Sequence, residues 1–149
     1  IIAEPLKEMD RRIFCEFPMG LDVDLLKVPM ERRVHFQPET KELFINFENY
    51  SIRSKKDIEE IYTVVNTICK DISETVKCIV NYDNFILISE FIDEYLDMIR
   101  YFKSHYFSQI NGYTTSTFLR TQINNILGSK NETLNIYDSL QEAEKALEK

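Results

Sequence analysis

The chain has 149 residues, of which 44% are hydrophobic and 29% are charged, and it carries a net charge of −7 at pH 7. These values are typical of an ordinary globular protein with one domain, or with one domain and a tail. Clustered Lys and Arg side chains bind phosphate groups, so the acidic balance argues against a nucleic acid or an acidic membrane surface as a partner. Two short basic clusters, Arg11–Arg12 and Arg53–Lys56, are interpreted as solvated faces. We also expect no membrane span, because every apolar run is far shorter than the roughly twenty residues that a span needs.

The three cysteines give no metal-binding or redox pattern. Cys15, Cys69 and Cys78 form neither a CxxC pair nor a Cys/His cluster, and an odd number of cysteines suits a secreted protein poorly. Cys69 and Cys78 lie in apolar surroundings and are predicted to be buried. We therefore expect a cytoplasmic protein. The chain starts at Ile1 without Met and is expected to be a piece of a longer protein, so the lack of a visible signal peptide says little.

Residues 1–27 differ in pattern from the rest and are predicted to form an extended, partly apolar arm. Proline and glycine residues interrupt any helical spacing in its second half. Such an arm cannot form a core of its own, and its apolar area would favour association if left bare. We expect these side chains to pack on the domain or across a homo-oligomer; they are Ile13, Phe14, Phe17 and Leu21.

Residues 28–149 are predicted to form one domain that begins with a β-hairpin. Residues 34–37 and 43–47 alternate apolar and polar side chains around the turn P-E-T-K-E. Ser54 then caps a helix whose apolar positions follow a period of 3.6 residues. The next segment, Val76–Val80, is short, apolar and rich in β-branched residues, as a buried central strand is.

The second half of the domain continues the alternation of strands and helices. Ser89 or Glu90 opens a second helix, and Phe107–Tyr113 fits a third strand. The remaining predicted elements are a helix capped by Thr115 or Ser116 and stopped by Gly128, an edge strand over Leu134–Tyr137, and a terminal helix with a capping box at Ser139 and Glu142. This order predicts an α/β fold with a mainly parallel, mixed sheet flanked by helices and the hairpin at one side.

Polar side chains gather where two predicted strands give way to helices. In open α/β sheets this edge, outside the carboxyl ends of the strands, is where ligands and partners bind. A carboxylate, several hydroxyls and a helix N-terminus with an arginine one turn later suit a partner or an anion. The alternative, which we favour, is that the aspartate makes an Asx turn and the Thr/Ser run caps the helix. The residues of this candidate edge are Asn81, Tyr82, Asp83, Tyr113, Thr114, Thr115, Ser116 and Arg120.

No residues in the sequence form a catalytic, cofactor-binding or metal-binding pattern. Neither His35 nor His105 stands beside a nucleophile in an elbow-like motif, and each is interpreted as a surface or helix-end histidine. The chain has three glycines and none of them forms a phosphate-cradling loop. An enzyme in its own right would need a pocket that joins Asp83, Tyr113 and Arg120.

Two stretches resemble a known family. The run P-L-K-E-M-D-R-R-I-F-C-E-F-P-M-G-L, within residues 1–21, resembles the carboxyl-terminal end of bacterial class I CoA-transferases of the acetate/propionate, 3-oxoacid type. Residues 22–128 resemble the extra domain that some of these transferases carry, whose layout is similar to STAS-type (anti-sigma-factor-antagonist-like) domains. The motifs that carry this second match are L-L-K-V-P-M-E-R-R-V, V-N-Y-D-N-F and Y-T-T-S-T-F-L-R.

The resemblance implies a role for the chain as well as a fold. The family moves CoA between carboxylic acids through a thioester on a glutamate that lies upstream of the family's end, so no residue here inherits that role. CoA thioesters would be substrates of the parent enzyme, and the upstream catalytic domains would be partners of this chain. We therefore expect a non-catalytic accessory domain for docking, oligomerisation or regulation. The alternative is an independent STAS-like signalling module, but N-Y-D-N offers no hydroxyl except that of Tyr82 where such domains carry a phosphorylatable Ser or Thr.

Overall fold

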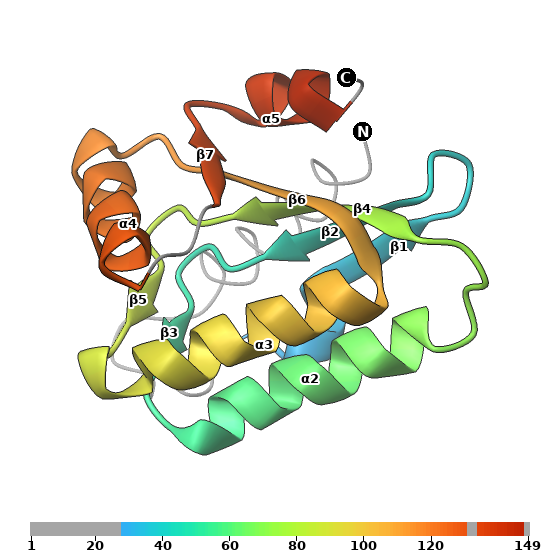
Figure 1. Cartoon of the computed structure of the whole chain (residues 1–149), viewed down its shortest axis with the longest axis horizontal. Helices are drawn as coiled ribbons and strands as arrows, with labels where there is room; N and C mark the ends of the chain where they lie inside the picture. The colour runs from blue at the N-terminus through green and yellow to red at the C-terminus, as the bar shows by residue number, and fades with distance from the viewer. Residues whose placement is uncertain (1–27, 131–133, 148–149) are drawn as a thin grey trace, which may run out of the picture.

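Alternating strands and helices build a mixed β-sheet in the computed structural model, which describes residues 28–130 and 134–147. Neighbouring strands follow the order β1–β2–β4–β6–β7, with β1 antiparallel to β2 and every other pair parallel (Figure 1). The strands are β1 (Val34–Gln37), β2 (Glu42–Asn46), β4 (Val76–Asn81), β6 (Phe107–Tyr113) and β7 (Asn135–Tyr137). The predicted α/β class, the mainly parallel mixed sheet and the hairpin at one side are confirmed.

Three helices connect the parallel strands and cover one face of the sheet. They are α2 (Lys55–Cys69), α3 (Ile92–His105) and α4 (Thr117–Ser129), and a 3-10 turn η3 (Ser89–Phe91) leads into α3. Each connection steps to the next parallel strand in the same direction, and because such crossovers share one hand, the helices fall on the same face. Their apolar side chains share one core with those of Leu43, Cys78 and Val80 from the sheet.

The terminal helix α5 (Leu140–Leu147) covers the opposite face of the sheet (Figure 1). Ala143 and Leu147 pack there against Phe44 and Ile79. Three sheet side chains donate hydrogen bonds to backbone carbonyl groups of α5. They are Lys77 Nζ to Leu147 O at 3.1 Å, Gln109 Nε2 to Ala146 O at 3.2 Å, and Asn111 Nδ2 to Ala143 O at 3.1 Å. The helix is therefore fastened to β4 and β6 by polar as well as apolar contacts.

The helix caps agree with the sequence prediction only in part. Ser89 and Glu90, expected to open the second helix, lie in η3, and α3 begins at Ile92 without a side-chain cap. The hydroxyl oxygens of Ser54 and Ser116 accept hydrogen bonds from the Asp57 and Leu119 amides, respectively. Gly128 does not stop α4, so that prediction was wrong. The helix continues to Ser129, because the Lys130 amide donates to carbonyl groups of the last turn and no left-handed glycine is needed there.

A second, very short sheet was not predicted. Strands β3 (Ser51–Ile52) and β5 (Ile86–Leu87) pair in parallel beyond the carboxyl ends of β2 and β4 (Figure 1). Two-residue strands carry no usable alternation, so no pattern in the sequence indicated them. They matter because β5 lines a pocket described below.

Three further expectations from the sequence concern the arm, the cysteines and membrane spans. The arm predicted over residues 1–27 lies outside the described residues. Cys69 and Cys78 are free thiols and both are buried, as predicted. No helix in residues 28–130 and 134–147 is long and apolar enough to cross a membrane.

Candidate functional site

The two polar segments of the candidate edge lie side by side at the carboxyl ends of β4 and β6. Asn81 pairs with Tyr113 in the parallel register of these strands. The Tyr82 amide donates to the Tyr113 carbonyl oxygen at 2.9 Å and so extends the pairing by one residue. Segments about thirty positions apart in sequence therefore meet at one edge, because adjacent parallel strands end together.

Asp83 joins these two segments through its side chain. Its Oδ1 accepts hydrogen bonds from Thr114 Oγ1 at 2.9 Å, from the Thr115 amide at 2.8 Å and from Thr115 Oγ1 at 3.2 Å. Thr114 is fully buried, and its Oγ1 also accepts from the Ser116 amide at 3.2 Å. Hydrogen bonds to an ionised carboxylate are stronger than those between neutral groups. The cluster of Asp83, Thr114, Thr115 and Ser116, called the polar clasp below, therefore holds the loop after β4 against the loop after β6.

Asn81 has a supporting role beside the polar clasp. It is buried, and its Oδ1 accepts from the Asp83 amide at 2.9 Å, which makes an Asx turn. The sequence interpretation assigned such a turn to the Asp83 side chain, which instead accepts from Thr114 and Thr115. Its Nδ2 donates to Asn46 Oδ1 at 3.2 Å, and Asn46 Oδ1 also accepts from the Glu48 amide at 3.0 Å. Two neighbouring strand ends thus use their asparagines to shape the loops that follow.

The side chain of Arg120 bonds to residues outside the polar clasp. Its guanidinium forms an ion pair with Asp138, just after β7, and a long hydrogen bond of 3.4 Å with Thr117 Oγ1. Ser116 uses its hydroxyl to cap α4. The arginine and the helix N-terminus therefore do not converge on a common anion-sized space.

The two tyrosines of the candidate edge lie on opposite faces of the sheet. Tyr113 is buried beneath α5, in the cluster that contains Phe44 and Ile79. Tyr82 is buried on the face covered by α3 and α4. The structure therefore does not join Asp83, Tyr113 and Arg120 in one pocket, which is the arrangement that an enzymatic role would have required.

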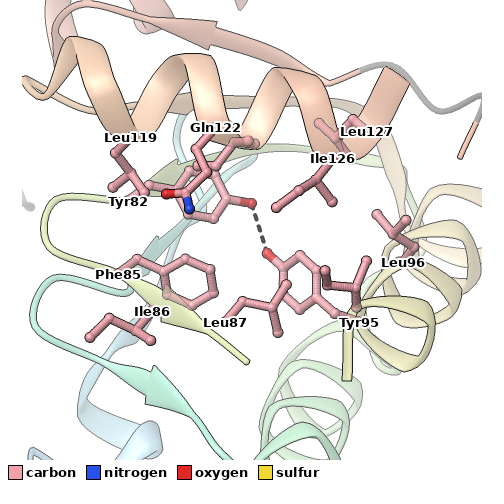
Figure 2. A pocket seen from close by; sticks show the side chains of 12 residues that line it. Tyr82, Phe85, Ile86, Leu87, Tyr95, Leu96, Leu119, Gln122, Ile126 and Leu127 are labelled. Carbon is pink, nitrogen blue, oxygen red and sulfur yellow. Dashed lines mark hydrogen bonds between the residues drawn. The ribbon is translucent and has the colours of Figure 1, made fainter. Parts of the chain in front are cut away.

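A pocket of about 260 Å³ lies on the helix-covered face (Figure 2). Tyr82, which precedes Asp83 of the polar clasp in sequence, is among its lining residues. The pocket is bounded by β5, the first half of α3, and α4. Its lining residues are Tyr82, Phe85, Ile86, Leu87, Ile92, Tyr95, Leu96, Leu119, Gln122, Ile123, Ile126 and Leu127. Ile86 is 45% exposed, so the pocket reaches the surface beside β5.

Tyr82 and Tyr95 meet inside this pocket. Their hydroxyl oxygens are 2.7 Å apart and form a hydrogen bond in which either can be the donor (Figure 2). Burial raises the pKa of both tyrosines above the ordinary value of 10.0. Both hydroxyls are therefore protonated and neutral throughout the physiological pH range.

Tyr95 and the apolar lining were not among the predicted site residues. The helical period of the sequence predicts an inward face with Ile92 and Tyr95 on the second helix, and with Phe118, Leu119, Ile123, Ile126 and Leu127 on the third. For Phe118 this prediction was wrong, because its side chain is 77% exposed. Inward-facing residues can fill a core or line a pocket, and helical periodicity does not separate the two. The one available hint was Tyr95, a tyrosine in the middle of an apolar helix face, because a buried tyrosine hydroxyl needs a hydrogen-bond partner.

The histidines and cysteines do not line the pocket or belong to the polar clasp. His35 Nε2 is 2.9 Å from the Arg32 carbonyl oxygen, and His105 Nδ1 is 2.9 Å from that of Tyr101, at the carboxyl end of α3. Burial raises the pKa of the Cys69 thiol to about 11, so it is not a thiolate at neutral pH. Within residues 28–130 and 134–147, no three His, Cys, Asp or Glu side chains are grouped so that they could hold a metal ion.

Fold and site together define an α/β domain with a mostly parallel sheet, a structural polar clasp and an apolar pocket. Comparison with protein-family models, curated proteins and solved structures finds no match to this chain. The interpretation of its function therefore depends on its own residues.

Proposed function

We propose that this chain is a non-catalytic accessory domain, used for docking, oligomerisation or regulation, in an acyl-CoA:acetate/3-ketoacid CoA-transferase of bacterial type. The proposal that the domain is non-catalytic is supported by the hydrogen bonds of Asp83. Three donors occupy one oxygen of its carboxylate, and these donors belong to the backbone and side chains of an adjacent loop. A general base or nucleophile needs its reactive atom directed toward a substrate, and Asp83 is directed toward its own fold.

The attachment to a CoA-transferase is supported by the resemblance of residues 1–21 to the end of those enzymes. In this proposal, the catalytic glutamate lies upstream of Ile1, CoA thioesters are substrates of the parent enzyme, and the upstream catalytic domains are this domain's first partners. The free, buried thiols of Cys69 and Cys78 suit the bacterial cytoplasm, where thiols are kept reduced. The STAS-like layout is part of the same proposal and is supported by the N-terminal hairpin and the helix-covered, mostly parallel sheet.

The test compares the full-length protein with a version that ends near Asp22. Both are assayed for CoA transfer between acetate and acetoacetate, and their oligomeric size is measured by light scattering. We expect the truncated version to retain chemistry but to change in oligomeric size or in its response to substrate concentration. CoA transfer by the isolated 149-residue chain would contradict the proposal. A reading frame that encodes no transferase upstream of Ile1 would favour the alternative, an independent STAS-like interaction module.

A further inference from the structure

The pocket between β5, α3 and α4 contains a hydrogen-bond donor that the protein does not use. The hydroxyls of Tyr82 and Tyr95 carry two protons, and the single bond between them uses one. Among the described residues, no other polar group contacts either hydroxyl. Both side chains are nearly fully buried, with exposures of 1% and 4%. One O–H group therefore has no acceptor among the described protein groups, and it lies in a mostly apolar pocket, where a ligand that accepts its hydrogen bond would gain affinity.

The rest of the lining specifies what else a ligand must be. Nine of the twelve lining residues have purely hydrocarbon side chains and none is charged. An ionised carboxylate or phosphate would lose its water there without gaining a cation, which is strongly unfavourable. A neutral molecule with an apolar body avoids that cost. Gln122, on the exposed side of α4, is the one polar lining residue besides the tyrosines.

The volume of the pocket sets the size of its ligand. An apolar cavity of about 150 Å³ is enough to hold benzene, which has six carbon atoms. The present pocket, at about 260 Å³, would by the same ratio hold a molecule of roughly ten non-hydrogen atoms. Its position outside the carboxyl end of β4 is also where ligands of open α/β sheets bind.

We propose that this pocket binds a compact, neutral, mostly apolar molecule with one hydrogen-bond acceptor, such as a small aromatic ketone or ester. The tyrosine pair donates its unused O–H to the acceptor atom, and side chains of β5, α3 and α4 enclose the apolar body (Figure 2). The inference does not depend on attachment to a CoA-transferase.

Three probe molecules of similar size test the proposal on the full 149-residue chain. Acetophenone has an apolar ring and one carbonyl acceptor, isopropylbenzene replaces the carbonyl oxygen by a methyl group, and benzoate is charged. Saturation-transfer NMR titrations give the dissociation constant of each. We expect acetophenone to bind about tenfold more tightly than isopropylbenzene, which is the effect of about one buried hydrogen bond. Benzoate is expected to show no saturable binding. Equal binding of acetophenone and isopropylbenzene, or saturable binding of neither, would overturn the proposal.

Substitutions locate the binding site and identify the donor. Leu119→Trp fills the pocket from α4 and is expected to weaken both neutral probes at least tenfold. Phe118→Trp is its matched control, because Phe118 is the neighbouring residue, is 77% exposed and does not line the pocket. The double variant Tyr82→Phe, Tyr95→Phe keeps the pocket shape and is expected to lose the preference for acetophenone, because the buried carbonyl then has no donor.

Retained acetophenone affinity in Leu119→Trp, or a retained preference for acetophenone in the double tyrosine variant, would overturn the assignment. The amide NMR spectrum of each variant checks that it is folded. If Leu119→Trp does not fold, the comparison of probes on the unsubstituted chain and on the double tyrosine variant still decides the question.

Discussion

Tyr82 and Asp83 are neighbours in sequence, yet their side chains enter regions of opposite character. Asp83 belongs to the polar clasp, where Thr114 and Thr115 supply donors for its carboxylate. Tyr82 enters an apolar pocket, where its hydroxyl meets only that of Tyr95. The hydrogen-bonding groups of the polar clasp are thus used by the fold. In the apolar pocket, one tyrosine O–H group has no acceptor among the described protein groups.

This comparison shows that a concentration of polar residues is a poor guide to a binding site. Asp, Thr and Ser side chains at strand ends commonly shape loops and cap helices, and here they do both. A ligand site needs hydrogen-bonding capacity that the fold has left over, together with space. The pocket meets both conditions and the polar clasp does not. Four substitutions or titrations test this difference, and they follow in order of decreasing effect.

The largest expected effect is that of Asp83→Ala on stability. The substitution removes the acceptor for three donors and leaves the buried Thr114 hydroxyl without its carboxylate partner. We expect the free energy of unfolding to fall by about 3 kcal/mol, measured by urea denaturation. Glu90→Gln is the control, since it neutralises an exposed carboxylate nearby in η3 and is expected to change stability little. A loss below that of the control would show that the clasp is not structural.

Gly112→Ala is expected to disturb the pocket and to lower the stability of the protein. A Cβ atom at Gly112 would lie 2.6 Å from Tyr82 Cε2 and 2.8 Å from Ile136 Cδ1, so the Tyr82 ring must shift. Overpacking of this kind costs about 2 kcal/mol of unfolding free energy. Gly128→Ala is the matched control, because nothing lies within 4 Å of the added atom and alanine is the better helix former in α4. That variant should be stabilised by roughly 0.5–1 kcal/mol in the same denaturation experiment.

Alkaline pH is expected to destabilise the pocket through its tyrosines. Burial raises the pKa of Tyr82 and Tyr95 in the folded state above 10.0, so the unfolded chain loses these protons first. Their contribution to stability is complete below about pH 10 and declines as the pH rises above it, by about 1.4 kcal/mol per pH unit for each tyrosine. The difference in pH dependence between the unsubstituted chain and Tyr82→Phe, Tyr95→Phe isolates this effect from other titrating groups. Parallel curves for the two proteins above pH 10 would contradict the burial of the pair.

The smallest expected effect is that of Ser116→Ala at the start of α4. The substitution removes the hydroxyl that accepts from the Leu119 amide at 3.1 Å. Loss of such a cap typically costs about 1 kcal/mol, measurable as a shift in the urea midpoint. Thr117→Ala, one residue further along, is the control because Thr117 is exposed and does not cap the helix. Equal midpoints for the two variants would argue against the cap.

Much of the fold was predictable because its elements follow clear periods. The alternation in residues 34–37 and 43–47 predicted the hairpin, and the apolar run at Val76 predicted a central strand. The meeting of the two polar segments was also predictable, since neighbouring parallel strands end at one edge. The pairing of β3 with β5 was not, because two residues are too few to show a pattern.

The function of each side chain at the edge was harder to predict. From the sequence, Asp83 could be either a ligand-binding group or a turn former. The three donors to its carboxylate in the structure indicate a structural role. The pocket was not predicted because its lining follows the same helical period as a filled core. Whether such residues touch one another or leave a space depends on how α3 and α4 pack, which local sequence does not determine.

The most direct test of the difference between the two regions is an NMR chemical-shift map of the full chain titrated with acetophenone. The predicted result is saturable changes at the methyl groups of Leu87, Ile92, Leu119 and Ile126, with the amides of Thr115 and Ser116 unmoved. Saturable changes confined to the polar clasp, with the pocket methyl groups unmoved, would contradict the account.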